Sequence, residues 1–165
     1  MTTQGPTVLL RRLAIAEVDF VVVGGVAVVV QALPRFTRDL DVCYATDQPN
    51  LERIAGVLSE IGARLRGTDE DLPFVPDARL LRQTQILALT TIEGELDLLI
   101  DPAGAPPYAE LRSRANVIDL DGLAVRVASI GDLLSMKRAA GRPQDLIDVE
   151  ALEIVRRRGG RRPKA

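Results

Sequence analysis

The chain has 165 residues, of which 47% are hydrophobic and 27% charged, and its formal net charge is -2. This length supports one compact domain rather than two, and the nearly balanced charge gives no overall signature of a nucleic-acid binder. Histidine is absent and Cys43 is the single cysteine, which excludes His-based catalytic pairs, cysteine-rich zinc sites and an intramolecular disulfide.

The first predicted elements are a helix and a buried strand. Residues 7–18 carry apolar side chains at helical spacing on one side, with Arg11 and Arg12 on the other. Residues 20–23 form a wholly apolar run that ends at two glycines, a pattern typical of a strand buried on both faces and followed by a tight turn.

A second helix and a second strand follow the glycines. Residues 26–33 are predicted to be helical up to Pro34, although Val28 to Val30 alone would favour a strand. Residues 39–44 form the next predicted strand. Asp47 and Pro49 then supply a cap and a first-turn proline for a helix that runs to about Gly62.

Two hairpins and two helices complete the chain. Residues 83–91 and 95–100 are predicted to pair through a short glycine-containing loop, and residues 116–120 and 123–127 to pair through Asp-Gly. A helix opens at Ser129, with Asp132 at capping-box spacing, and ends at Gly141. A final helix begins at Pro143.

This order of elements predicts an α/β fold: a mixed β-sheet flanked by helices, with two helices at the C-terminus. We expect one domain over residues 1–158, with its core over about 18–128 and a helical part over 129–158, and a basic tail at 159–165. No apolar run approaches the roughly 20 residues of a membrane span, and the N-terminus has no signal-like segment. We therefore expect a cytoplasmic protein without a membrane partner.

Two carboxylates stand out on the strand at residues 39–44. Asp39 and Asp41 are two residues apart, so both project from the same face of the strand. Two like charges about 4 Å apart repel by roughly 4 kcal/mol at an effective dielectric near 20, so the pair needs a proton, a partner or a cation. Gly24 and Gly25 precede them and let backbone N–H groups approach phosphate oxygens. Together these features outline a site for a metal and a nucleotide.

The run from Gly24-Gly25 to Asp39-Leu40-Asp41 resembles the nucleotidyltransferase superfamily of the DNA polymerase β type. Asp97 matches the third carboxylate of that superfamily, and Glu95 is a rival on the same strand face. The resemblance implies a nucleotidyltransferase-like fold in which Asp39, Asp41 and Asp97 bind two Mg²⁺ ions, with Mn²⁺ as an alternative. It also implies a nucleoside triphosphate substrate.

The fuller pattern is similar to the AbiEii-type toxin nucleotidyltransferases. It adds Arg35 and Thr37 before the aspartates, and a late lysine motif and an Arg-x-x-Asp-x-x-Asp motif in the C-terminal helices. The resemblance implies catalytic roles for Lys137 and Asp145 beside the three carboxylates. The residues that it implies at the nucleotide are Gly24, Gly25, Arg35, Thr37, Lys137 and Asp148.

The predicted activity is metal-dependent transfer of a nucleoside monophosphate to an acceptor hydroxyl, with release of pyrophosphate. The resemblance implies a toxin of a toxin-antitoxin system that acts on tRNA and has a cognate antitoxin. The basic tail would suit a polyanionic acceptor or simply aid solubility; DNA is not an expected partner. Two alternatives remain: nucleotidylation of an antibiotic or another small molecule, and a non-catalytic nucleotide-binding module of the same fold.

Overall fold

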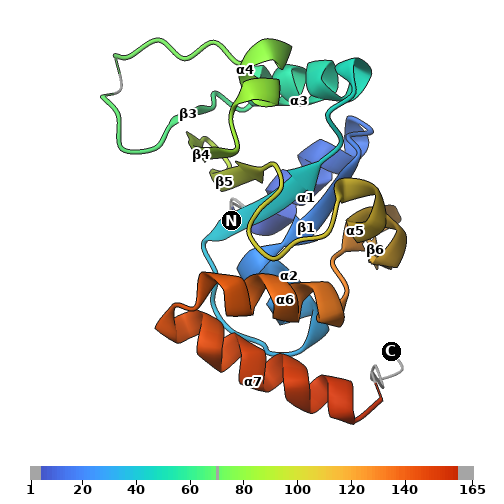
Figure 1. The fold of residues 1–165 in the computed structure, drawn as a ribbon. Coiled ribbons are helices and arrows are strands. Elements are labelled where there is room, and N and C mark those ends of the chain that lie inside the picture. The colour runs from blue at the N-terminus through green and yellow to red at the C-terminus, as the bar shows by residue number, and fades with distance from the viewer. Residues whose placement is uncertain (1–4, 70, 160–165) are drawn as a thin grey trace.

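One mixed β-sheet runs through the protein (Figure 1). The computed structural model describes residues 5–69 and 71–159, and within them the sheet has seven strands. From one edge to the other these are β3 (Arg64–Leu65), β4 (Ile86–Thr91), β5 (Gly94–Leu99), β2 (Asp39–Tyr44), β1 (Phe20–Val23), β7 (Leu123–Val127) and β6 (Asn116–Leu120).

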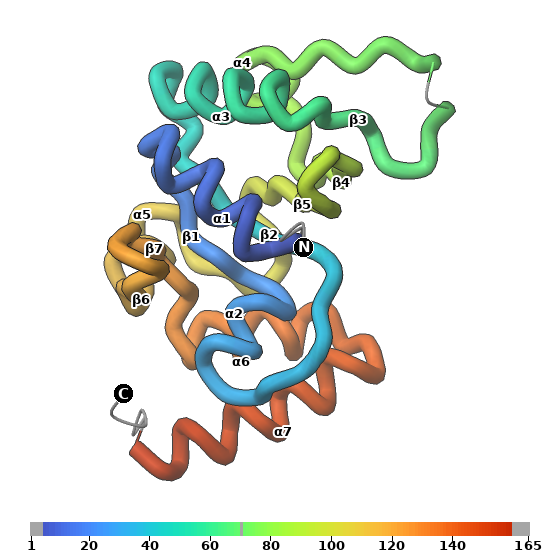
Figure 2. The backbone as a smooth tube through the Cα atoms, turned by 180° about the vertical axis from the view of Figure 1, so that it is seen from behind, coloured from blue at the N-terminus to red at the C-terminus, as the bar shows by residue number. Residues whose placement is uncertain are grey.

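Helices lie on and around this sheet, which confirms the predicted mixed α/β class. The last two pack against each other and against the short second helix, and the third and fourth lie together beyond the β3–β4 side of the sheet (Figures 1 and 2). The helices of the described ranges are α1 (Pro6–Ile15), α2 (Gly24–Gln31), α3 (Gln48–Glu60), α4 (Ala78–Gln83), α5 (Tyr108–Arg114), α6 (Ile130–Ala140) and α7 (Pro143–Arg157).

The wholly apolar run at residues 20–23 forms β1, and all four of its side chains are buried. It pairs with β2 in the antiparallel sense and with β7 in the parallel sense, so neighbours on both sides satisfy its backbone. β2 in turn pairs with β5 in the parallel sense. This pairing decides which polar side chains meet, because parallel neighbours in register present their side chains on the same face.

The predicted elements reappear with shifts of a few residues, and three short elements were not predicted. α1 ends at Ile15 rather than at residue 18, and Glu17, two residues after the helix, takes a positive φ of 58°. The first predicted hairpin begins at Ile86 rather than at residue 83. Gln83 is instead the last residue of α4, and the side chain of Asp77 caps the first turn of that helix. α4, α5 and β3 have at most seven residues each, too few for a periodic pattern to show.

The C-terminal helices follow the caps expected from the sequence. The hydroxyl of Ser129 accepts a hydrogen bond from the backbone of Asp132, and Gly141 takes the left-handed conformation that ends α6. No helix within the described residues is long and apolar enough to cross a membrane. Most of the predicted basic tail, residues 160–165, lies outside the described residues.

Candidate active site

Four carboxylates from two neighbouring strands share one face of the sheet. In the parallel pairing of β2 with β5, Asp39 lies opposite Glu95 and Asp41 lies opposite Asp97. Alternation along each strand places all four side chains on the same side, while Leu40 and Leu96 point into the core. The three predicted metal ligands therefore belong to one acidic cluster, and Glu95 adds a fourth carboxylate.

The acidic cluster holds more negative charge than its surroundings accommodate easily. Burial, together with the nearby charges of Asp97 and Asp39, raises the pKa of Asp41 from 3.8 to about 7. A hydrogen bond with Asp39 and partial desolvation raise the pKa of Glu95. Such shifts mean that ionising the whole cluster costs free energy unless a cation approaches it.

Arg66, which the sequence did not single out, supplies a cation to this cluster. Its Nη2 donates to Oδ1 of Asp97 at 2.7 Å and to the backbone oxygen of Leu89 at 3.0 Å. Its Nη1 lies 3.9 Å from Oδ2 of Asp39, and its Nε lies 3.8 Å from Oε2 of Glu95. Arg66 directly follows β3, a strand of two residues, so no pattern in the sequence pointed to it.

The glycine turn lies directly against the acidic cluster. Gly24 begins α2 with a positive φ of 65°, and a Cβ at this position would lie 2.1 Å from Oδ2 of Asp41. A Cβ on Gly25 would lie 2.9 Å from Oγ1 of Thr37 and 3.0 Å from Nη2 of Arg35. The absence of both side chains lets the start of α2 lie close to Asp41, Thr37 and Arg35.

Replacing Gly24 with alanine is expected to lower the melting temperature and to destabilise the fold by about 2–3 kcal/mol. The new methyl group would collide with Asp41, and the positive φ disfavours any side chain. Gly56 on α3 is the matched control, because a Cβ there meets nothing within 4 Å. Gly56→Ala should stabilise by roughly 0.5–1 kcal/mol; equal losses in the two variants would contradict the close approach at Gly24.

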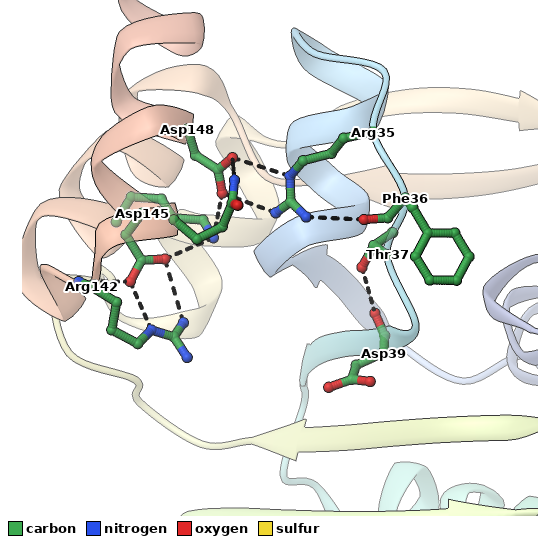
Figure 3. A network of polar contacts seen from close by, with 9 residues as sticks. Arg35, Phe36, Thr37, Asp39, Arg142, Asp145 and Asp148 are labelled. Atoms are coloured by element: carbon green, nitrogen blue, oxygen red, sulfur yellow. Dashed lines mark hydrogen bonds and ion pairs between the residues drawn. The ribbon is translucent and has the colours of Figure 1, made fainter.

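The C-terminal motifs form an ion-pair network around a buried lysine. Figure 3 shows the two carboxylates of this network, Asp145 and Asp148, with Arg35 and Arg142 beside them. Lys137 on α6 is only 7% exposed, and its Nζ lies 3.1 Å from Oδ1 of Asp145 and 3.0 Å from Oδ2 of Asp148. Both aspartates project from the first turns of α7 and are buried. The ammonium group of Lys137 is thus paired with two carboxylates rather than exposed to solvent.

Two arginines complete this network: Arg35 in the loop before β2 and Arg142 directly before α7. Arg35 binds Asp148 in a bidentate manner through Nε at 3.1 Å and Nη2 at 3.0 Å, which ties the loop before β2 to α7. Arg142 donates to Asp145 from its backbone at 3.1 Å and from its Nε at 2.8 Å. Figure 2 shows the α2–β2 loop passing beside α7, where the Arg35 contact joins them.

These contacts change the pKa values of both aspartates. Burial raises the pKa of Asp145, but hydrogen bonds from Arg142 and Lys137 outweigh it and lower the value to about 2. Burial also raises the pKa of Asp148, but hydrogen bonds from Lys137, Arg35 and Gln144 outweigh it and lower the pKa below its ordinary value. Both groups are therefore ionised at neutral pH and stabilise the packing of α7 on α6 and on the α2–β2 loop.

A cavity of about 560 Å³ connects the acidic cluster, the glycine turn and the C-terminal network. Asp148 lies outside its lining, behind Lys137 and Arg35, and Glu95 also lies outside it. Arg142, the arginine of the Arg-x-x-Asp-x-x-Asp motif, also lines the cavity, and 75% of its side chain is exposed. The predicted residues that line the cavity are Gly24, Gly25, Arg35, Thr37, Asp39, Asp41, Asp97, Lys137 and Asp145.

The donor set of the acidic cluster suits Mg²⁺, a hard cation that prefers carboxylate oxygens. The raised pKa of Asp41 and the close glycine turn both fit a cation there. No group of three or more His, Cys, Asp or Glu in residues 5–69 and 71–159 is already arranged around a metal position. The guanidinium of Arg66 lies among three of the four carboxylates instead.

Comparison with known families gives one match that spans most of the chain. The family described as "Nucleotidyl transferase AbiEii toxin, Type IV TA system" matches residues 8–156. These residues include the glycine turn, the acidic cluster and both C-terminal motifs. A search of curated protein sequences finds no significant match.

Solved structures share the fold at low sequence identity. The lincomycin-bound lincosamide antibiotic adenylyltransferase LnuA is 15% identical, with a TM-score of 0.58 over 88% of this chain and 92% of that one. The structure of ANT(2")-Ia in complex with adenylyl-2"-tobramycin is 15% identical, with a TM-score of 0.53 over 92% and 95%. An antigenic nucleotidyltransferase-like protein from Paracoccidioides brasiliensis is 16% identical, with a TM-score of 0.53 over 90% and 73%.

Proposed function

The chain belongs to the AbiEii family of nucleotidyl transferase toxins, and from that premise we propose that it transfers a nucleoside monophosphate from a nucleoside triphosphate to an acceptor hydroxyl. In this reaction a bond forms between the acceptor oxygen and the α-phosphorus, and the bond from that phosphorus to pyrophosphate breaks. The observation that carries the proposal is the acidic cluster of β2 and β5, which faces a cavity beside the glycine turn.

Asp39, Asp41 and Asp97 would hold two Mg²⁺ ions, or Mn²⁺ in their place. Bound metal would neutralise the developing charge on the phosphates and acidify the attacking hydroxyl. Asp97 would orient that hydroxyl and accept its proton, since it lies at the cavity opposite Asp41. Backbone N–H groups at Gly24 and Gly25 would bind phosphate oxygens at the start of α2.

The C-terminal network would position the nucleotide rather than react with it. Lys137 and Arg35 line the cavity while bound to Asp145 and Asp148, so they fix the cavity wall and contribute positive charge to it. Thr37 stands between Gly25 and Asp39 and would help to shape the phosphate site. Arg142 has the exposed guanidinium that a phosphate group needs for direct contact.

For the acceptor we propose tRNA, with a cognate antitoxin that restrains the activity. Membership of a family described as type IV toxin-antitoxin toxins supports the antitoxin. The acceptor tRNA is what the resemblance to those toxins implies. A second candidate acceptor is a small molecule such as an antibiotic. It is favoured by the fold neighbours of similar length, LnuA and ANT(2")-Ia, whose structures contain lincomycin and adenylyl-2"-tobramycin.

One experiment distinguishes the two acceptors. The purified protein is incubated with each α-labelled nucleoside triphosphate, Mg²⁺ and total cellular RNA, and in parallel with a panel of lincosamides and aminoglycosides. We expect label in the tRNA size range and release of pyrophosphate, both abolished by EDTA. Label only in an antibiotic would select the second candidate, and no transfer to either acceptor class would contradict the proposed function.

A further inference from the structure

Arg66 occupies a position that the proposed reaction does not use. Its guanidinium lies on the carboxylate face of the sheet, within 3.9 Å of oxygens of Asp39, Glu95 and Asp97. Its side chain is 28% exposed, so part of it is shielded from water. Its backbone N–H donates to the oxygen of Ala88 at 2.9 Å, which anchors the residue to β4 independently of its side chain.

The fit of this guanidinium to the acidic cluster is incomplete. Only the 2.7 Å contact with Asp97 is a hydrogen bond to a carboxylate, whereas the approaches to Asp39 and Glu95 are ion pairs at 3.9 and 3.8 Å. Nε of Arg66 is buried and has no hydrogen-bond partner. A buried donor without an acceptor costs free energy, so charge attraction rather than ideal geometry holds the head group in place.

Because two of the carboxylates that Arg66 contacts are proposed metal ligands, Arg66 and a divalent cation compete for the same oxygens. We propose that Arg66 is a built-in counter-ion of the acidic cluster, which Mg²⁺ or Mn²⁺ must displace before the site is loaded. The inference rests on the proposed metal site and adds a moving part to it. The side chain leaves the carboxylates while the backbone of Arg66 stays bonded to Ala88, so loading with metal frees a tethered cation beside Asp97.

The test compares Mn²⁺ binding by the intact chain and by the variant Arg66→Met, measured by calorimetry without nucleotide. Arg66→Met keeps an unbranched side chain and removes the competing charge, and we expect it to bind Mn²⁺ at least about tenfold more tightly. Arg53→Met, on the exposed face of α3 and outside the cavity lining, changes the net charge equally and should bind like the unmodified chain. Without metal, Arg66→Met should melt at a lower temperature, and Mn²⁺ should raise its melting temperature more.

Equal or weaker Mn²⁺ binding by Arg66→Met would overturn the inference and leave the metal site standing. Absence of Mn²⁺ binding by both proteins would overturn the metal site as well. A measurement on the unmodified chain makes the test independent of whether the variant folds. We expect the Arg66 Nε–H resonance, followed by NMR during titration with Mg²⁺, to shift and exchange faster with water. A resonance that stays unchanged at saturating Mg²⁺ would show that the head group does not move.

Discussion

Asp41→Asn is expected to abolish nucleotidyl transfer without weakening the metal-free fold. An asparagine has the size of the aspartate but cannot supply the negative charge that the proposed metal ions need. Metal stabilisation of transition-state charge is worth several kcal/mol, so we expect a loss of activity of about a thousandfold or more. The fold keeps its stability because the variant removes a carboxylate that burial and its neighbours Asp97 and Asp39 already disfavour as an anion.

Glu95→Gln is the matched control for this variant. Glu95 belongs to the same acidic cluster and loses the same charge, but it does not line the cavity. Its replacement should reduce initial rates by less than about tenfold, measured with labelled triphosphate under the same conditions. Activity of Asp41→Asn above a tenth of the unmodified level would contradict the metal-site proposal. So would a lower midpoint of chemical unfolding without metal.

Lys137→Met is expected to cause the largest loss of stability, about 3–5 kcal/mol. The lysine is almost fully buried and contacts two buried carboxylates, and removing one partner of a buried ion pair leaves uncompensated charge in the interior. The measurement is urea unfolding at neutral pH. Arg138→Met, one residue further along α6, removes an exposed cation paired with Glu153 and should cost less than about 1 kcal/mol.

The pH dependence of unfolding tests the same network. The folded-state pKa of Asp145 is about 2, below the ordinary 3.8, and that of Asp148 is also lowered. Their contribution to stability is therefore present above about pH 4 and is lost as the pH falls towards 2. In Lys137→Met the folded-state pKa values of both aspartates lose a cause of their lowering, so the variant should lose less stability than the unmodified chain as the pH falls from about 4 to about 2. A double variant that adds Asp148→Asn should recover part of the stability, and no recovery would contradict an ion-pair origin.

Much of the fold follows from local patterns in the sequence. The apolar run at residues 20–23 and the alternation at residues 39–44 predict strands, and both strands appear within those limits. Alternation also places Asp39 and Asp41 on one face, whereas their meeting with Asp97 depends on the parallel pairing of β2 with β5. The alternation along a strand predicts which face a side chain occupies. The prediction that Asp97 joins Asp39 and Asp41 came from the resemblance to a known family.

The remaining features arise from tertiary contacts that no local pattern encodes. Lys137 lies on an amphipathic helix, where most lysines face water, but α7 folds over α6 and buries it. Arg66 belongs to no periodic pattern in the sequence. It reaches the acidic cluster because β3, the strand directly before it, pairs with β4. Charged residues whose partners lie far away in the sequence are therefore the part of this site that is hardest to predict from the sequence.

The contact of Arg35 with Asp148 joins positions that are 113 residues apart. A charge reversal at position 35 would set two carboxylates side by side, and one at position 148 would set a cation against both Arg35 and Lys137. Among descendants of this chain, we expect these two positions to be kept together. A chimaera that takes α7 from a relative should then work only when it also inherits the matching residue before β2.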